Sequence, residues 1–326
     1  MRKRLFLFSV VMAGLLAGLS SLSLSVSASE KSLRVLCTTF PIYQITRNVA
    51  QGRSAVHVDL MVPAQLGCPH DYALTPQDMN KIAQADVLVA NGLGMEEFLG
   101  APVKRANDKI AVIDSSRGIQ NILEYSEEDE SEHGDTHEHS HHKSESEHDH
   151  ENTGVNPHLF ASPRMAAKLA MNIAEELSKI DPDDSAVYMK NAEEYAKKMN
   201  TLADEFAALV STLKNNRIIT QHGVFDYLAR DAGLEIVAVL QSHAGQEPSA
   251  SEMLEIVSTI KEKQAGAIFT EPQYPNKVGK AIAKEAGIPT AILDPAASGP
   301  EDAGLDYYEK VMKNNMETLK KTLGTK

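Results

Sequence analysis

Residues 184–213, which read DSAVYMKNAEEYAKKMNTLADEFAALVSTL, decide the architecture that we expect for this chain. Apolar side chains recur there at alternating intervals of four and three residues: Tyr188, Ala192, Tyr195, Met199, Leu202, Phe206 and Leu209. This spacing places them on one side of a single α-helix. At 1.5 Å per residue the helix would be about 45 Å long, enough to act as a stiff strut between two lobes.

Short β-branched runs alternate with helical patterns on both sides of this helix. The runs that we expect to be strands are 33–37, 56–61, 87–90 and 110–113 before it, and 218–221, 236–240, 267–270 and 291–293 after it. Thr75 and Ser249, each followed three residues later by an acidic residue, predict helix starts between strands. Such alternation is typical of parallel sheets with crossover helices.

We therefore predict an α/β protein with two lobes, each a four-stranded parallel sheet with flanking helices, joined by one long rigid helix. The N-terminal lobe would span residues 29–183 and the C-terminal lobe residues 214–326, with the linking helix at 184–213. The alternative is a single large sheet with a surface helix.

Residues 126–151 interrupt the first lobe with eleven acidic residues, a single lysine and almost nothing apolar. Such a segment cannot bury enough surface to offset the entropy of ordering, so we predict a disordered acidic insertion. Seven of the twelve histidines lie in it: His133, His137, His139, His141, His142, His148 and His150. They form either an auxiliary low-affinity metal site or part of a solvated spacer. Residues 137–141 also match the HExxH pattern of zinc proteases, which we reject because no packing face would fix the histidines.

The N-terminus reads as an export signal. Three basic residues precede an apolar stretch at 5–19, and a small-residue segment ends at Ala28. This pattern predicts a signal peptide cleaved after Ala28. No cysteine lies at that cut, so we expect no lipid anchor there.

Composition excludes several classes of protein. The 326 residues carry 45 acidic and 32 basic side chains, a formal net charge of −13, which is the wrong sign for a nucleic-acid binder. Only two cysteines are present, so no zinc site can be built from four thiolates. Any metal site must rely mainly on histidine and carboxylate ligands.

Three histidines outside the insertion lie on connections that follow predicted strands. These are His70, His158 and His222, and Asp294 directly follows the last predicted strand. Because ligands of open parallel sheets bind beyond the carboxyl ends of the strands, we expect these four side chains to meet, two from each lobe. Three neutral imidazoles and one carboxylate suit Zn²⁺.

Other polar residues near the strand ends have lesser roles in this interpretation. Glu271 follows another predicted strand and would be either a fifth ligand or the acceptor that orients an imidazole. His57 lies within a strand pattern and is interpreted as structural, and His243 is not counted among the ligands. Cys37 and Cys68 leave two possibilities open: a disulfide between them, or Cys68 as a metal thiolate.

Four motifs carry a resemblance to a known family. Residues 69–72 (PHDY), 156–158 (NPH), 221–222 (QH) and 293–295 (LDP) follow in order the motifs of the metal-binding solute receptors of zinc and manganese ABC importers. The chain most resembles the periplasmic zinc receptors, which carry an acidic, histidine-rich loop between the first two ligands. It departs from the family where Asn156 replaces the usual aspartate.

The resemblance implies a receptor that binds Zn²⁺ between two lobes, with His70, His158, His222 and Asp294 as ligands, and delivers it to a membrane permease. The protein would be periplasmic and monomeric, and not an enzyme, because four protein ligands leave no open position for a reacting water. Three alternatives remain: the same receptor with manganese or iron as cargo, an extracellular metallohydrolase, and a zinc-buffering protein or adhesin.

Overall fold

The chain folds into two parallel sheets that repeat one strand order. The computed structural model describes residues 32–69, 72–96, 98–124, 154–241 and 247–325. The first sheet has the order β2-β1-β3-β4 and the second the order β6-β5-β7-β8. The strands are β1 (Leu33–Cys37), β2 (Val56–Leu60), β3 (Val87–Ala90), β4 (Ala111–Asp114), β5 (Arg217–Thr220), β6 (Glu235–Val239), β7 (Ala267–Thr270) and β8 (Thr290–Ile292). Every predicted strand is present, with each end within one residue of its predicted position.

Nine α-helices connect and cover these strands within the described residues. They are α1 (Phe40–Val49), α2 (Pro76–Gln84), α3 (Ala101–Ala106), α4 (Pro163–Ile180), α5 (Ser185–Thr212), α6 (Asp226–Ala232), α7 (Ala250–Lys263), α8 (Lys277–Ala286) and α9 (Tyr307–Leu323). Helices α2 and α7 begin at the predicted caps, where the Thr75 and Ser249 hydroxyls each accept a hydrogen bond from the backbone N three residues on. Each cap satisfies a donor that the helix start leaves open.

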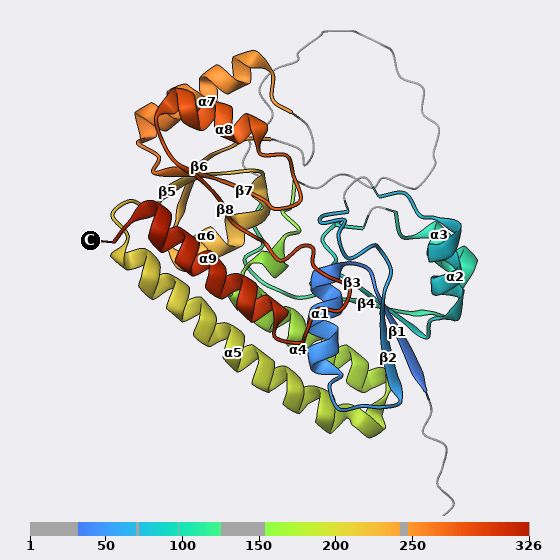
Figure 1. Ribbon diagram of the computed structural model, residues 1–326. Coiled ribbons are helices and arrows are strands. Elements are labelled where there is room, and N and C mark those ends of the chain that lie inside the picture. The colour runs from blue at the N-terminus through green and yellow to red at the C-terminus, as the bar shows by residue number, and fades with distance from the viewer. Residues whose placement is uncertain (1–31, 70–71, 97, 125–153, 242–246, 326) are drawn as a thin grey trace, which may run out of the picture. The chain divides into compact units, whose positions relative to one another are not determined.

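Neighbouring residues of the inner strands point to opposite faces of each sheet. In β1, Val35 and Cys37 belong to a large central hydrophobic cluster, whereas Leu36 packs in a separate cluster with α2 and α3. In β5, Ile218 joins the central cluster and Ile219 a third cluster with α7 and α8. Figure 1 shows these helix pairs beside their sheets. Because helices cover both faces, the inner strands β3 and β7 are buried along their whole length rather than at alternate residues.

Helix α5 runs along the central cluster and contacts helices that precede and follow it in the chain. It packs against α1 and α4, and also against α6 and α9 (Figure 1). Six of its seven predicted apolar positions are buried and Leu209 is half-buried. The central cluster includes Val89 of the first sheet and Phe269 of the second, so one continuous core serves both halves.

The predicted two-lobed α/β architecture with its long connecting helix is therefore confirmed. Residues 32–326 form one compact unit, and the domain boundaries at 183 and 214 stay predictions. The expected signal peptide and the acidic insertion with its seven histidines lie outside the described residues. None of the helices in the described part of the chain combines the length and the apolar character needed to cross a membrane.

Candidate metal site

The described candidate ligands lie at the carboxyl ends of strands or on the connections that follow them. His222 follows β5 and precedes a 3₁₀ turn at Gly223–Phe225. His158 precedes a second 3₁₀ turn, Leu159–Ala161, on the connection between β4 and α4. Asp294 lies just beyond β8. His70 and His243 lie outside the described residues.

The structure brings the rings of His158 and His222 together. Their ring centroids are 5.1 Å apart and their planes are inclined at 77°. Both residues are buried, with exposed fractions of 0% and 3%. They converge with Cys68: one ligand atom from each of the three residues lies within 4.8 Å of the other two. Neither Asp294 nor Glu271 belongs to this group of described residues.

The amide of Asn156 orients the His158 ring. Its Oδ1 accepts a hydrogen bond from the His158 backbone N at 3.0 Å and lies 2.9 Å from the ring Nδ1. Because an amide oxygen only accepts, Nδ1 carries the proton and Nε2 carries the lone pair that a metal needs. The Asn156 Nδ2 donates to Gly223 O at 2.7 Å and to Asp226 Oδ2 at 2.8 Å. The asparagine that replaces the usual aspartate thus still supports His158.

The carboxylate of Glu271 engages the other imidazole. Its Oε1 lies 2.6 Å from the His222 Nδ1, and both side chains are buried. The second oxygen, Oε2, accepts a hydrogen bond from Gln273 Nε2 at 2.6 Å. A carboxylate on one ring nitrogen leaves the other for a metal, an arrangement common around zinc-binding histidines. Of the two roles predicted for Glu271, this geometry favours the orienting one.

Asp294 is held by a hydrogen bond within its own loop and by Asn315 of α9. Its Oδ1 accepts a hydrogen bond from the Ala296 backbone N at 2.8 Å. Asn315 donates to its carbonyl at 2.7 Å and accepts from its backbone N at 2.9 Å. Burial, and then the nearby Glu271 charge, raise the pKa of the Asp294 carboxyl above its ordinary value. A bound cation would offset both effects.

The suggested disulfide is absent, because Cys37 and Cys68 are both free thiols. Cys37 is fully buried in the central cluster, and burial raises its pKa to about 12. Cys68 is half-buried and faces the two imidazoles instead. Burial, followed by the Glu271 charge, raises the pKa of the Cys68 thiol well above its ordinary value. The two sulfurs therefore belong to different environments, and no local sequence pattern decides between the two possibilities.

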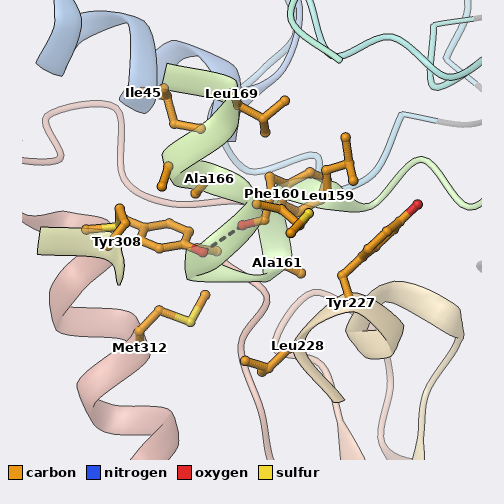
Figure 2. Close-up of a cluster of buried hydrophobic side chains, with 14 of the residues drawn as sticks. Ile45, Leu159, Phe160, Ala161, Ala166, Leu169, Tyr227, Leu228, Tyr308 and Met312 are labelled. Atoms are coloured by element: carbon orange, nitrogen blue, oxygen red, sulfur yellow. Dashed lines mark hydrogen bonds between the residues drawn. The ribbon is translucent and has the colours of Figure 1, made fainter. Parts of the chain in front are cut away.

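The loop that carries His158 is bound to the second half of the chain. Tyr308 of α9 donates its hydroxyl hydrogen to the Phe160 carbonyl at 2.7 Å, deep in the central cluster (Figure 2). Tyr227 of α6 donates to the Asn156 carbonyl at 2.7 Å. Ser162 donates to Asp231 at 2.5 Å. These bonds fix where His158 lies relative to the segment that carries His222.

Comparison with known proteins agrees with the fold and with the motifs. The family model described as "Zinc-uptake complex component A periplasmic" matches residues 35–322. The chain is 34% identical over 310 residues to the high-affinity zinc uptake system protein ZnuA of Bacillus subtilis, covering 94% of this chain and 92% of that protein.

Two solved structures extend the comparison to metal-bound proteins. FpvC of Pseudomonas aeruginosa in complex with Mn²⁺ aligns with a TM-score of 0.73 at 28% identity, over 90% of this chain and 98% of that one. Zn(II)-bound AdcA of Streptococcus pneumoniae aligns with a TM-score of 0.70 at 27% identity, and this chain spans 58% of its length. The motifs, the two sheets with the same strand order and these matches agree, and the chain belongs to the family of periplasmic zinc-uptake complex A components.

Proposed function

We propose that this protein is an extracytoplasmic receptor that captures Zn²⁺ between its two lobes and delivers it to the permease of an ABC importer. The observation that carries the proposal is the pair of buried imidazoles, His158 and His222. Each has its Nδ1 next to an acceptor, the arrangement that orients an imidazole to bind a metal through Nε2.

The proposed ligand set combines this pair with two residues assigned by the motifs. His70 supplies a third imidazole, and the motifs assign the fourth position to Asp294. Nitrogen-rich coordination favours Zn²⁺ over Mn²⁺, which prefers more oxygen ligands. The names of the ZnuA and AdcA relatives agree with zinc as cargo.

The proposed coordination supports the role of a receptor and not that of an enzyme. Four protein ligands around Zn²⁺ complete its usual tetrahedron and leave no position for a reacting water. Membership of the zinc-uptake family supports the same conclusion. We propose that the protein acts as a monomer and that its macromolecular partner is the membrane permease.

Export is part of the proposal, because the receptor must meet its ion outside the cytoplasm. The predicted signal peptide at residues 1–28 would direct the chain to the periplasm and would be cleaved after Ala28. The acidic insertion at 126–151, with seven histidines and almost no apolar residues, would collect zinc weakly.

Zinc calorimetry on the mature protein tests the site. We expect one tight zinc equivalent in the wild type and in a variant that lacks residues 127–150. His158→Ala and His222→Ala should each lose that equivalent, whereas His57→Ala should keep it, because His57 is exposed on β2. The proposal would be overturned if the variant without residues 127–150 lost tight zinc binding while His222→Ala retained it.

Manganese is the second candidate cargo, because the aligned FpvC structure holds Mn²⁺. Competition titration between the two ions decides between the candidates. Zn²⁺ should displace Mn²⁺ from the single tight site at equal concentration. Preferential retention of Mn²⁺ would assign the receptor to manganese instead.

A further inference from the structure

The side chain of Cys68 has a position that the zinc-receptor motifs do not explain. It lies two residues before the PHDY motif, on the connection that follows β2. Among the described residues, it forms with His158 and His222 the group whose ligand atoms lie within 4.8 Å of one another. Donors bound to one Zn²⁺ at 2.0 to 2.3 Å are separated by roughly 3.5 Å, so this spacing needs only a small contraction.

The neighbouring imidazole provides an independent indication that a cation belongs here. His222 is 3% exposed, and its Nε2 is buried with no hydrogen-bond partner among the described residues. Leaving a buried polar atom without a partner is energetically unfavourable. Its Nδ1 is next to Glu271 Oε1, at 2.6 Å. A bound metal ion would give the buried Nε2 a partner.

We propose that the Cys68 sulfur is a ligand of the transported Zn²⁺, together with the imidazoles of His158 and His222. This inference rests on the receptor function proposed above and refines its coordination. The thiolate takes the position that the motifs assign to Asp294, which is outside the group and already accepts a hydrogen bond from its own loop.

A sulfur ligand would also set the selectivity of the site. Thiolates bind Zn²⁺ strongly, whereas Mn²⁺ prefers carboxylate, carbonyl and water oxygens. Replacing a carboxylate by a thiolate therefore widens the difference in affinity between the two ions. Cys68 would be a specificity-determining residue and not merely one more donor.

X-ray absorption at the zinc edge tests the sulfur ligand directly. The mature protein is loaded with one equivalent of Zn²⁺ under reducing conditions. We expect one sulfur scatterer at about 2.3 Å in addition to nitrogen at about 2.0 to 2.1 Å. Cys68→Ala should lose the sulfur scatterer, and the matched control Cys37→Ala should keep it, because Cys37 is buried in the central cluster.

Affinity and a cobalt spectrum supply the second measurement. Cys68→Ala should weaken zinc binding by more than about tenfold. Removing a residue that only hydrogen-bonds to a metal ligand already weakens metal affinity by about that much, and a direct ligand should contribute more. Its affinity for Mn²⁺ should change little. With Co²⁺, the wild type and Cys37→Ala should show the near-ultraviolet charge-transfer band of a thiolate ligand, and Cys68→Ala should not.

The outcomes separate this inference from the receptor function. Tight zinc binding with nitrogen and oxygen neighbours only, unchanged in Cys68→Ala and lost in Asp294→Ala, would overturn the thiolate and leave the receptor intact. Absence of tight zinc binding in the wild type would overturn the receptor function itself. Circular dichroism of each variant shows whether a loss of binding reflects unfolding.

Discussion

The Asn156 side chain donates a hydrogen bond to the carbonyl oxygen of Gly223 at 2.7 Å. Asn156 lies two residues before His158, and Gly223 is the residue after His222. The same amide holds the His158 ring through its oxygen, at 2.9 Å. A single side chain therefore sets both the orientation of one imidazole and its separation from the segment that carries the other.

Removing this amide should weaken zinc binding without removing a ligand. Asn156→Ala loses the partner of the His158 Nδ1, and such losses typically cost about 10 to 100-fold in metal affinity. It also leaves the buried Gly223 carbonyl without this donor, which should lower the free energy of unfolding by about 1 to 3 kcal/mol. Zinc calorimetry and urea unfolding measure the two effects.

Asn156→Asp is the informative companion variant. It keeps an acceptor for the His158 ring but loses the donor to Gly223. Zinc affinity should therefore stay closer to the wild type than in Asn156→Ala. Equal affinity in all three proteins would show that the amide does not position the ring.

Glu271→Gln should weaken zinc binding by about 10 to 100-fold, because a neutral amide holds the His222 ring less firmly and makes it a poorer donor. The carboxylate is 2.6 Å from the ring Nδ1. Glu235→Gln is the matched control, since Glu235 forms an exposed ion pair with Arg217 and lies outside the site. Calorimetry on both variants tests the orienting role. A larger loss, comparable to that in His222→Ala, would instead indicate that Glu271 binds the ion itself.

Removing the hydroxyl group should change the free energy of unfolding differently at two buried tyrosines of the core. Tyr308 donates to Phe160 O at 2.7 Å, so Tyr308→Phe should lower the free energy of unfolding by about 1 to 3 kcal/mol. The hydroxyl of Tyr195 is buried without a hydrogen-bond partner among the described residues. Tyr195→Phe should therefore be neutral or stabilising. Urea unfolding at pH 7 measures both, and equal losses in the two variants would contradict the assignment.

The buried carboxyl of Glu96 should make stability depend on pH. Burial raises the pKa of Glu96 from 4.5 to about 7, against hydrogen bonds from Thr38, Asn91 and Gly92 that favour the charged form. Between these two pH values the folded protein holds a proton that the unfolded chain has lost. The corresponding stability is fully present below about pH 4.5 and is lost as the pH rises through about 7.

The size of the effect is roughly 3 kcal/mol at most. It is measured as the difference in free energy of unfolding between the wild type and Glu96→Gln, at pH 5 and at pH 8. Relative to this variant, the wild type should lose stability at the higher pH. A difference that does not change with pH would mean that the three hydrogen bonds keep Glu96 charged in the folded state.

The sequence predicted the regular elements well because local patterns determine them. The period of α5 and the caps at Thr75 and Ser249 are properties of short segments, and all three were found. The positions of His158 and His222 after predicted strands led us to expect them close together, and their ring centroids are 5.1 Å apart.

The finer features of the site depend on long-range packing and could not be predicted in this way. Cys68 faces the imidazoles because of the path of its loop, which no periodicity describes. The bond from Asn156 to Gly223 joins residues that are close only after both halves have folded. The same holds for the hydroxyl of Tyr308 on the loop of His158.

The unbroken core along α5 has a consequence for how this protein melts and how it can be dissected. Since the same apolar cluster covers the inner faces of both sheets, neither sheet retains a complete interior when the chain is cut. Heating should therefore produce a single calorimetric peak, and fragments expressed separately should remain insoluble or unstructured until they are mixed.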